Sequence, residues 1–325
     1  MARQYRSYRN YGCRLTDDLM YKGYRSIVLE NESLQVMLLL DKGGEPVRWL
    51  HKKSDTDFIW HTRAGLLPAH PLYPDYQMSY LGGWQEMLPE VSETHIYRGA
   101  VVHRGETAVT PWDCELIRED DEELRVRLTN RLRSLPLFIE KTFVLRCDDA
   151  TVRIEETVRN EAPVPIEFNW GHHLAFGPPF LDTGTKVEFA PGSIVLNAAT
   201  GERSEWPAAP GKEPNDLSAM AQPGTPRPLL AVETPEGAYR LRHGGKPVAL
   251  EVRWDRNVWP YVWYWQNFAA DPDAPFFGCE YNIGLEPFNV PPKWTLAEAS
   301  ARGAALRLEP HGALSSWLHI AVKEV

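Results

Sequence analysis

Alternation of apolar and polar side chains with a period of two residues is the feature of this chain that most constrains its fold. Successive side chains of a β-strand point to opposite faces, so an alternating stretch has one face for a core and one for water. The clearest example is 124–133, in which apolar or small residues alternate with charged or polar ones. Alternation predicts strands at 24–30, 34–40, 124–133, 137–146, 151–159, 164–169, 187–190, 238–243, 248–255, 261–268 and 314–322.

Helical periodicity is nearly absent, since 295–305 has room for only one or two turns. So many strands with hairpin-like spacing indicate an all-β fold, namely a large antiparallel β-sandwich. We expect one domain over residues 1–325, with a flexible N-terminal arm at about 1–20 and an inserted loop at 197–228. The stretch 66–88 is also irregular and rich in proline, and loops of this length often carry function.

Composition excludes several classes of protein. The 35 basic and 44 acidic residues leave a net charge of −9, which disfavours a nucleic-acid partner. The longest apolar run, 36–40, is far too short to cross a membrane, and the polar first residues lack a secretory signal, so we expect a cytoplasmic protein. The cysteines are too widely spaced for a disulfide framework or a cysteine zinc site: Cys13, Cys114, Cys147 and Cys279.

Aromatic residues are concentrated in 254–268, where alternation places Trp263 and Trp265 on one face and Tyr264 and Gln266 on the other. Aromatic rings offer a flat apolar surface with a polar edge, which suits the C–H faces and hydroxyl rim of a sugar. The alternative is that these rings fill a wide sandwich core.

Two further segments carry groups for acid/base chemistry. His172 and His173 lie at the end of a β-type segment, where only one of them can face a given cleft, and an imidazole is a natural general acid near neutral pH. Glu286 lies near the end of an apolar strand, two residues after Gly284, which leaves space beside the carboxylate. A buried carboxylate must be paired or used, so Glu286 is either a general base or a salt-bridge partner.

A glycine turn, Gly82-Gly83, precedes Trp84, Gln85 and Glu86 and permits the close approach of a ligand to the backbone. It lacks the spacing of a phosphate-binding loop. We therefore interpret it as a ligand-binding loop.

These segments together resemble the aldose 1-epimerase (galactose mutarotase-like) family. The resemblance rests on His173-Leu-Ala-Phe and Gly284-Leu-Glu-Pro, and on their order along nearly the whole chain, between Gly43-Gly44-Glu45 and a C-terminal strand after Glu309-Pro-His-Gly. It implies a β-supersandwich, with His173 as the catalytic acid and Glu286 as the catalytic base. His172 falls where many members have Asn, and the family's Asn-Arg pair and first His are not recognisable; the glycine turn and the three residues after it occupy roughly that place.

The resemblance implies a mutarotase, which opens and recloses a cyclic hemiacetal and so interconverts sugar anomers. An ionised Glu near pKa 4.3 would accept the anomeric proton and a His near pKa 6.5 would donate one to the ring oxygen. We expect no cofactor or metal, a small-molecule carbohydrate as ligand, and a monomer or homodimer. The residues expected to hold the sugar are Trp84, Gln85, Glu86, His172, Trp265 and Gln266.

Three alternatives remain open at this point. The first is a carbohydrate-binding protein without catalysis on the same fold. The second is a metal-dependent sugar isomerase or lyase that uses His172, His173 and Glu86 as ligands. The third is a sugar-phosphate epimerase, for which Arg63 and Arg256 are candidate phosphate ligands.

Overall fold

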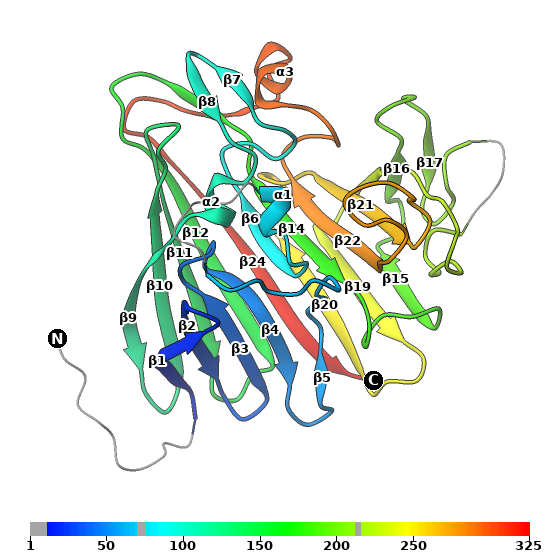
Figure 1. Cartoon of the computed structure of the whole chain (residues 1–325), viewed down its shortest axis with the longest axis horizontal. Coiled ribbons are helices and arrows are strands. Elements are labelled where there is room, and N and C mark those ends of the chain that lie inside the picture. The colour runs from blue at the N-terminus through cyan, green and yellow to red at the C-terminus, as the bar shows by residue number, and fades with distance from the viewer. Residues whose placement is uncertain (1–11, 70–75, 212–215) are drawn as a thin grey trace.

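The structure, a computed structural model, describes residues 12–69, 76–211 and 216–325 (Figure 1). One layer is an eight-stranded antiparallel sheet with the order β15-β19-β20-β24-β12-β11-β10-β9. Its strands are β9 (Asp113–Glu119), β10 (Glu123–Arg131), β11 (Leu137–Arg146), β12 (Thr151–Asn160), β15 (Thr185–Phe189), β19 (Ala238–His243), β20 (Val248–Trp254) and β24 (Ala313–Glu324).

The opposing layer consists of two sheets. The five-stranded sheet has the order β1 (Arg14–Tyr21), β2 (Tyr24–Glu30), β3 (Leu34–Leu39), β4 (Glu45–His51) and β5 (Thr56–Asp57). The seven-stranded sheet has the order β17 (Arg203–Glu205), β16 (Ile194–Leu196), β18 (Leu230–Glu233), β21 (Tyr261–Phe268), β22 (Tyr281–Phe288), β14 (Gly171–Phe176) and β6 (Trp84–Met87). A single apolar cluster includes residues of all three sheets, such as Phe143 of β11, Trp49 of β4 and Tyr264 of β21. The core therefore lies between the two layers, as in a β-sandwich.

Short elements complete the described part of the chain. They are the strands β7 (His95–Tyr97), β8 (Ala100–Val102), β13 (Ile166–Phe168) and β23 (Leu306–Leu308) and the helices α1 (Tyr76–Ser79), α2 (Glu106–Val109) and α3 (Leu296–Ala301). The β7–β8 hairpin and α3 lie together at one end of the molecule (Figure 1), where Glu167 accepts hydrogen bonds from Tyr97 and Ser300. Within the described ranges, the helices are too short to span a lipid bilayer.

The all-β prediction is confirmed. Every stretch in which alternation predicted a strand overlaps one, and 24–30, 137–146, 238–243 and 261–268 agree with strands at both ends. In β10, β11 and β12 buried and partly exposed residues alternate over much of the strand, so that one face is buried. The short helix expected within 295–305 is α3, which begins with a capping box formed by Thr295 and Glu298.

The prediction of a flexible N-terminal arm is wrong for residues 14–20, because Arg14–Tyr21 form β1, which pairs with β2. This strand lies at the edge of its sheet and buries few side chains, so it lacks the alternation of an inner strand. Residues 1–11 lie outside the described residues. In the loop at 197–228, the described residues contain β17, which pairs with β16.

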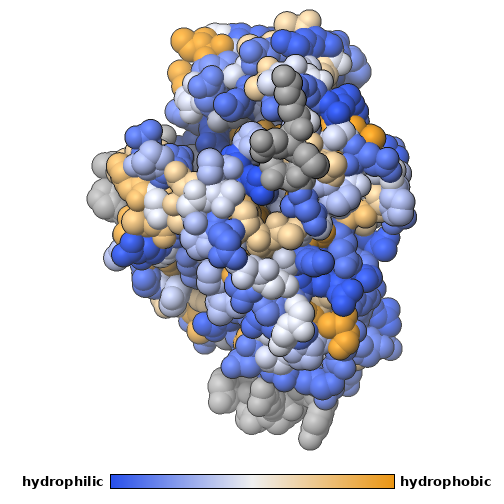
Figure 2. Space-filling view, turned by 90° about the vertical axis from the view of Figure 1, so that its right-hand side faces the viewer, coloured by the Kyte–Doolittle hydropathy of each residue, from blue (hydrophilic) through white to orange (hydrophobic). Residues whose placement is uncertain are grey.

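Polar residues dominate the face of the molecule shown in Figure 2, where apolar residues form small, separate groups. Several large aromatic side chains of 254–268 are buried, among them Trp254, Tyr264 and Phe268, as in the alternative that rings of this stretch fill the sandwich core. Burial of these apolar faces supplies the main favourable contribution to the folding of a sandwich.

Candidate active site

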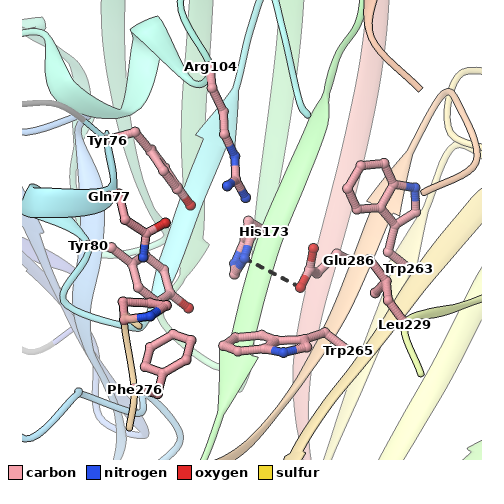
Figure 3. Close-up of a pocket in the computed structure, with 11 residues that line it drawn as sticks. Tyr76, Gln77, Tyr80, Arg104, His173, Leu229, Trp263, Trp265, Phe276 and Glu286 are labelled. Atoms are coloured by element: carbon pink, nitrogen blue, oxygen red, sulfur yellow. Dashed lines mark ion pairs between the residues drawn. The ribbon is translucent and has the colours of Figure 1, made fainter. Parts of the chain in front are cut away.

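His173 and Glu286 lie directly opposite each other on neighbouring strands of the seven-stranded sheet. Antiparallel pairing of Gly171 with Phe288 and of Ala175 with Gly284 sets this register between β14 and β22. Opposite residues of an antiparallel pair point to the same face. The two side chains accordingly meet, with Nε2 of His173 3.5 Å from Oε1 of Glu286 (Figure 3). They are 113 positions apart in the sequence (286 − 173), so only the sheet brings them together.

Gly284 provides the space that the Glu286 carboxylate occupies. A Cβ atom at position 284 would lie 2.0 Å from Oε1 of Glu286 and 3.0 Å from its carboxyl carbon. No side chain can replace glycine there without moving the carboxylate. The glycine two residues before Glu286 therefore has the role expected from the sequence.

The pair lines a cavity of about 210 Å³. Aromatic rings form much of its wall, and Tyr80 and Trp265 approach the His173 imidazole edge-on, with ring centroids 5.3 Å and 5.8 Å away. Arg104 points toward the pair from the side opposite Trp265 (Figure 3). The lining residues are Tyr76, Gln77, Tyr80, Arg104, His173, Leu229, Trp263, Trp265, Pro275, Phe276 and Glu286.

Burial shifts the pKa values of the pair in opposite directions. His173 and Glu286 are only 6% and 2% exposed. Burial, with a smaller contribution from the nearby Arg104 cation, lowers the pKa of His173 to about 3. Burial raises the pKa of Glu286 well above its ordinary value, although Arg104 opposes this shift. A proton held by the unliganded pair is therefore favoured on the carboxyl over the imidazole, the reverse of the arrangement expected from the sequence.

Arg104 and two tyrosines add polar groups to the aromatic wall. The Arg104 guanidinium stacks over the Tyr76 ring, 4.6 Å from its centroid. The hydroxyls of Tyr76 and Tyr80 are buried and have no hydrogen-bond partner among the described residues. Buried hydroxyls usually have partners, so these two are suited to bind the hydroxyl groups of a ligand. Sequence reasoning missed all three residues, although it singled out 66–88, the irregular stretch that contains the two tyrosines.

Trp84, Glu86 and His172 do not line the cavity, and their predicted contact with a sugar there does not fit the structure. Trp84 pairs with Leu174 and Glu86 pairs with His172 across β6 and β14. These residues alternate with His173 along the strands, so they point to the opposite face and into the sandwich core.

In the core these side chains form a polar network. The indole N–H of Trp84 donates to Nδ1 of His172 (3.1 Å), and Nε2 of His172 lies 3.0 Å from Oε2 of Glu156. Because an indole can only donate, Nδ1 must accept, and the His172 proton is on Nε2. Burial lowers the pKa of His172 to about 3, so this ring stays neutral.

The alternative of a metal site that uses both histidines does not fit the structure, because His172 and His173 face opposite sides of the sheet. A different acidic cluster exists in the core, where ligand atoms of Glu86, Glu156 and His172 lie within 4.8 Å of one another. The Lys141 ammonium already lies 2.9 Å from Oε2 of Glu86 and provides the positive charge. The cluster is therefore a buried ion network in which the Lys141 ammonium offsets the negative charge of the carboxylates.

Gln85 and Gln266 lie close to the cavity without lining it. Gln85 pairs with His173 and shares its face, but its amide donates to Oε2 of Glu45 and to the carbonyl of Gly82. Gln266 lines a neighbouring cavity instead. Among the predicted sugar-binding residues, Trp265 is the one that lines the cavity of the His173–Glu286 pair.

Neither arginine proposed for a phosphate lies in the cavity wall. The backbone N–H of Arg63 donates to Glu280, and its side chain is exposed. The exposed Arg256 donates to the carbonyl of Pro235. The cation at the cavity is Arg104, which no sequence motif marks.

Solved structures with the same fold come from several bacteria. The Slr1438 protein of Synechocystis sp. PCC 6803 is 16% identical, with a TM-score of 0.66 and coverage of 100% of both chains. A Klebsiella pneumoniae protein provisionally named an aldose 1-epimerase is 12% identical, with a TM-score of 0.73 and coverage of 95% of this chain and 83% of that one. A galactose mutarotase-like protein from Clostridium acetobutylicum is 11% identical, with a TM-score of 0.71 and coverage of 97% and 100%.

These similarities establish a galactose mutarotase-like fold, as the sequence resemblance predicted. No sequence among the curated proteins matches the chain. The family described as "Domain of unknown function (DUF4432)" matches residues 22–322, which is nearly the whole chain. The chain therefore belongs to the DUF4432 family and has a galactose mutarotase-like fold.

Proposed function

We propose that the cavity interconverts the α and β anomers of an aldose by acid/base catalysis. The observation that carries this proposal is the facing pair of His173 and Glu286, 3.5 Å apart in the lining of an aromatic cavity. Two solved structures with this fold, one provisionally named an aldose 1-epimerase and one named a galactose mutarotase-like protein, support the same reaction class.

The cavity suits a single sugar ring. Its volume of about 210 Å³ is below the roughly 300–1,000 Å³ of sites for drug-sized ligands. Trp265 and Trp263 offer flat apolar surfaces for the C–H groups of a pyranose. Arg104 and the hydroxyls of Tyr76 and Tyr80 can bind its hydroxyl groups.

The reaction needs one proton donor and one proton acceptor. In ring opening, Glu286 takes the proton of the anomeric hydroxyl while protonated His173 donates a proton to the ring oxygen, and the bond from C1 to that oxygen breaks. The pair then consists of a protonated Glu286 and a neutral His173. Rotation about the C1–C2 bond exposes the other face of the aldehyde, and reversal of both transfers closes the ring as the other anomer.

The pair holds one proton throughout this cycle. Burial favours its location on Glu286, which is the state that accompanies the open sugar. Opening begins from the less populated state, with the proton on His173 and the carboxylate ionised. The titration of such a pair belongs to both residues together.

The acid limb of the pH profile of kcat/KM should lie below that of an ordinary Glu and His pair. A rise in pH removes the single proton only at the raised pKa of Glu286, and a fall in pH adds a second proton only near the lowered pKa of His173, about 3. We therefore expect the acid limb of anomer exchange to have its midpoint near pH 3 rather than near 4.3, the pKa of an ordinary Glu. An acid limb with its midpoint near pH 4.3 would show that Glu286 titrates as an exposed carboxyl does.

Gly284→Ala should lower kcat by about 10²-fold, because the new Cβ would displace the Glu286 carboxylate, and a misplacement of about 1 Å can cost that much. The effect on KM should be much smaller. The matched control is Gly244→Ala, whose Cβ would have no atom within 4 Å. If both variants exchange anomers at the wild-type rate, the position of this carboxylate does not matter for the reaction.

The test of the proposed function is NMR exchange spectroscopy with a panel of aldoses. The protein should speed exchange between the α and β signals of at least one of them. Sugar binding with no faster exchange would instead indicate a carbohydrate-binding protein.

A further inference from the structure

A second cavity, of about 340 Å³, adjoins the first. It lies between the end of β21 and the segments 226–227 and 270–276, and it shares two lining residues, Trp265 and Phe276, with the cavity of the His173–Glu286 pair. The two rings stack with centroids 5.4 Å apart and an interplanar angle of 32°. Figure 3 shows them next to each other along one side of the first cavity. The aromatic pair therefore forms a wall between two binding spaces.

An unpartnered amide group lines the second cavity. Asn267 is 5% exposed, and its Nδ2 has no hydrogen-bond partner among the described residues. Asn267 follows Trp265 by two positions on β21, so both side chains point to the same face, whereas Gln266 between them points to the opposite one. Buried amide groups usually have hydrogen-bond partners, so Asn267 indicates a site for a polar ligand.

The charges at this cavity are balanced. Arg227 and Asp271 both line it, and they are the charged residues among its lining. An aromatic wall combined with the Asn267 amide and no net charge suits an uncharged polyhydroxylated ring. A phosphate or sulfate group would be expected to have an excess of cations around it.

We propose that the second cavity binds a further sugar residue of a reducing oligosaccharide, whose reducing-end ring occupies the first cavity. This inference rests on the proposed function, since anomer exchange requires a free C1 hydroxyl on the ring beside His173 and Glu286. The glycosidic bond would start from another carbon of that ring and cross the edge of the Trp265–Phe276 pair. The substrate class is then a disaccharide or longer glycan with a neutral second unit.

The test compares reducing disaccharides with their reducing-end monosaccharides. Maltose, cellobiose, isomaltose, laminaribiose, lactose and melibiose, all of which have glucose at the reducing end, are titrated against glucose by calorimetry and by NMR exchange. At least one disaccharide should bind wild-type protein about tenfold or more tightly than its reducing-end monosaccharide. If no disaccharide in this panel gains affinity over its reducing-end monosaccharide, the proposal is overturned.

Two variants locate the gain in the second cavity. Ala270→Phe fills it from a half-buried loop position, and Asn267→Leu removes the amide at similar size. Each should reduce the affinity for the disaccharide to that of the monosaccharide, while the affinity and exchange rate of the monosaccharide stay within twofold of wild type. If Ala270→Phe lowers the affinity for the disaccharide and for the monosaccharide by the same factor, the proposal is overturned, even if Asn267→Leu fails to fold.

This experiment separates the two claims. Tight disaccharide binding that the variants abolish, with no anomer exchange by wild type, would support the second site and refute the proposed reaction. Exchange of monosaccharides without any gain for disaccharides would refute the second site alone.

Discussion

Glu286→Gln should lower the rate of anomer exchange by about 10²–10⁴-fold, the usual contribution of general acid/base assistance, while sugar binding stays nearly unchanged. Glutamine keeps the shape and hydrogen-bonding capacity of the side chain but cannot exchange a proton with the sugar. The cavity holds His173 as the other group within 3.5 Å that can take part in this transfer. Exchange is measured by NMR and binding by calorimetry.

His173→Asn should have an effect of similar size, and the double variant should lose much less than the product of the two losses, because the pair acts as a unit. Glu324→Gln is a suitable control, since that carboxylate is 63% exposed and lies on the surface. A Glu286→Gln protein that equilibrates anomers within a few-fold of wild type would refute the role of this carboxylate.

Lys141→Met should destabilise the protein by about 3–5 kcal/mol, the usual cost of removing one partner of a buried ion pair. The Lys141 ammonium lies 2.9 Å from Oε2 of Glu86 and 4.4 Å from the centroid of the Trp112 ring. Glu86 also accepts a hydrogen bond from the indole of Trp170, and Glu156 lies nearby with a pKa that burial raises to about 8. Without Lys141 these acidic groups would lose the cation that lies against Glu86.

Urea denaturation measures this loss, with Lys53→Met as the matched control. Lys53 pairs with Glu324 on the surface, where both side chains are mostly exposed, so its removal should cost about 0–1 kcal/mol. Lys141→Met combined with Glu86→Gln should recover part of the stability, because the unpaired charge is gone. A Lys141→Met protein as stable as the Lys53→Met control would show that the network does not depend on this cation.

Alternation predicted β10, β11 and β12 because each buries one face and leaves the other partly exposed. The predicted and observed bounds of β11 and β12 nearly coincide. Edge strand β1 has no such pattern, since it buries little. Inner strands β14 and β22 have none either, since nearly every residue in them is buried. A strand could thus be predicted from alternation where one of its faces is buried and the other is not.

The site could be predicted only in part. Short motifs identified His173 and Glu286, and alternation required His172 to face away from His173. However, the pattern does not tell which face holds a cavity, so Trp84, Glu86 and His172 were assigned to the wrong side. Other cavity residues could not be found, because Tyr76 and Arg104 lie on α1 and on the turn before α2, where no periodicity marks them.

The pKa values could not be predicted from the sequence either. They depend on how completely β14, β22 and the loops over them exclude water from His173 and Glu286, and on Arg104, which is distant in the sequence. Ordinary values suggested an ionised Glu286 and a partly protonated His173. In the folded protein, burial moves the favoured proton to the carboxyl.

The most direct measurement of the central claim is two-dimensional NMR exchange spectroscopy of a panel of aldoses, with wild-type protein, with Glu286→Gln and with buffer alone. The panel contains hexoses, pentoses, 6-deoxy sugars, sugar 6-phosphates and reducing disaccharides. The account predicts cross-peaks between the α and β anomeric signals of at least one sugar with the wild type, at mixing times where buffer and the variant show none. Binding of a sugar by wild-type protein with no such cross-peaks for any member of the panel would contradict it.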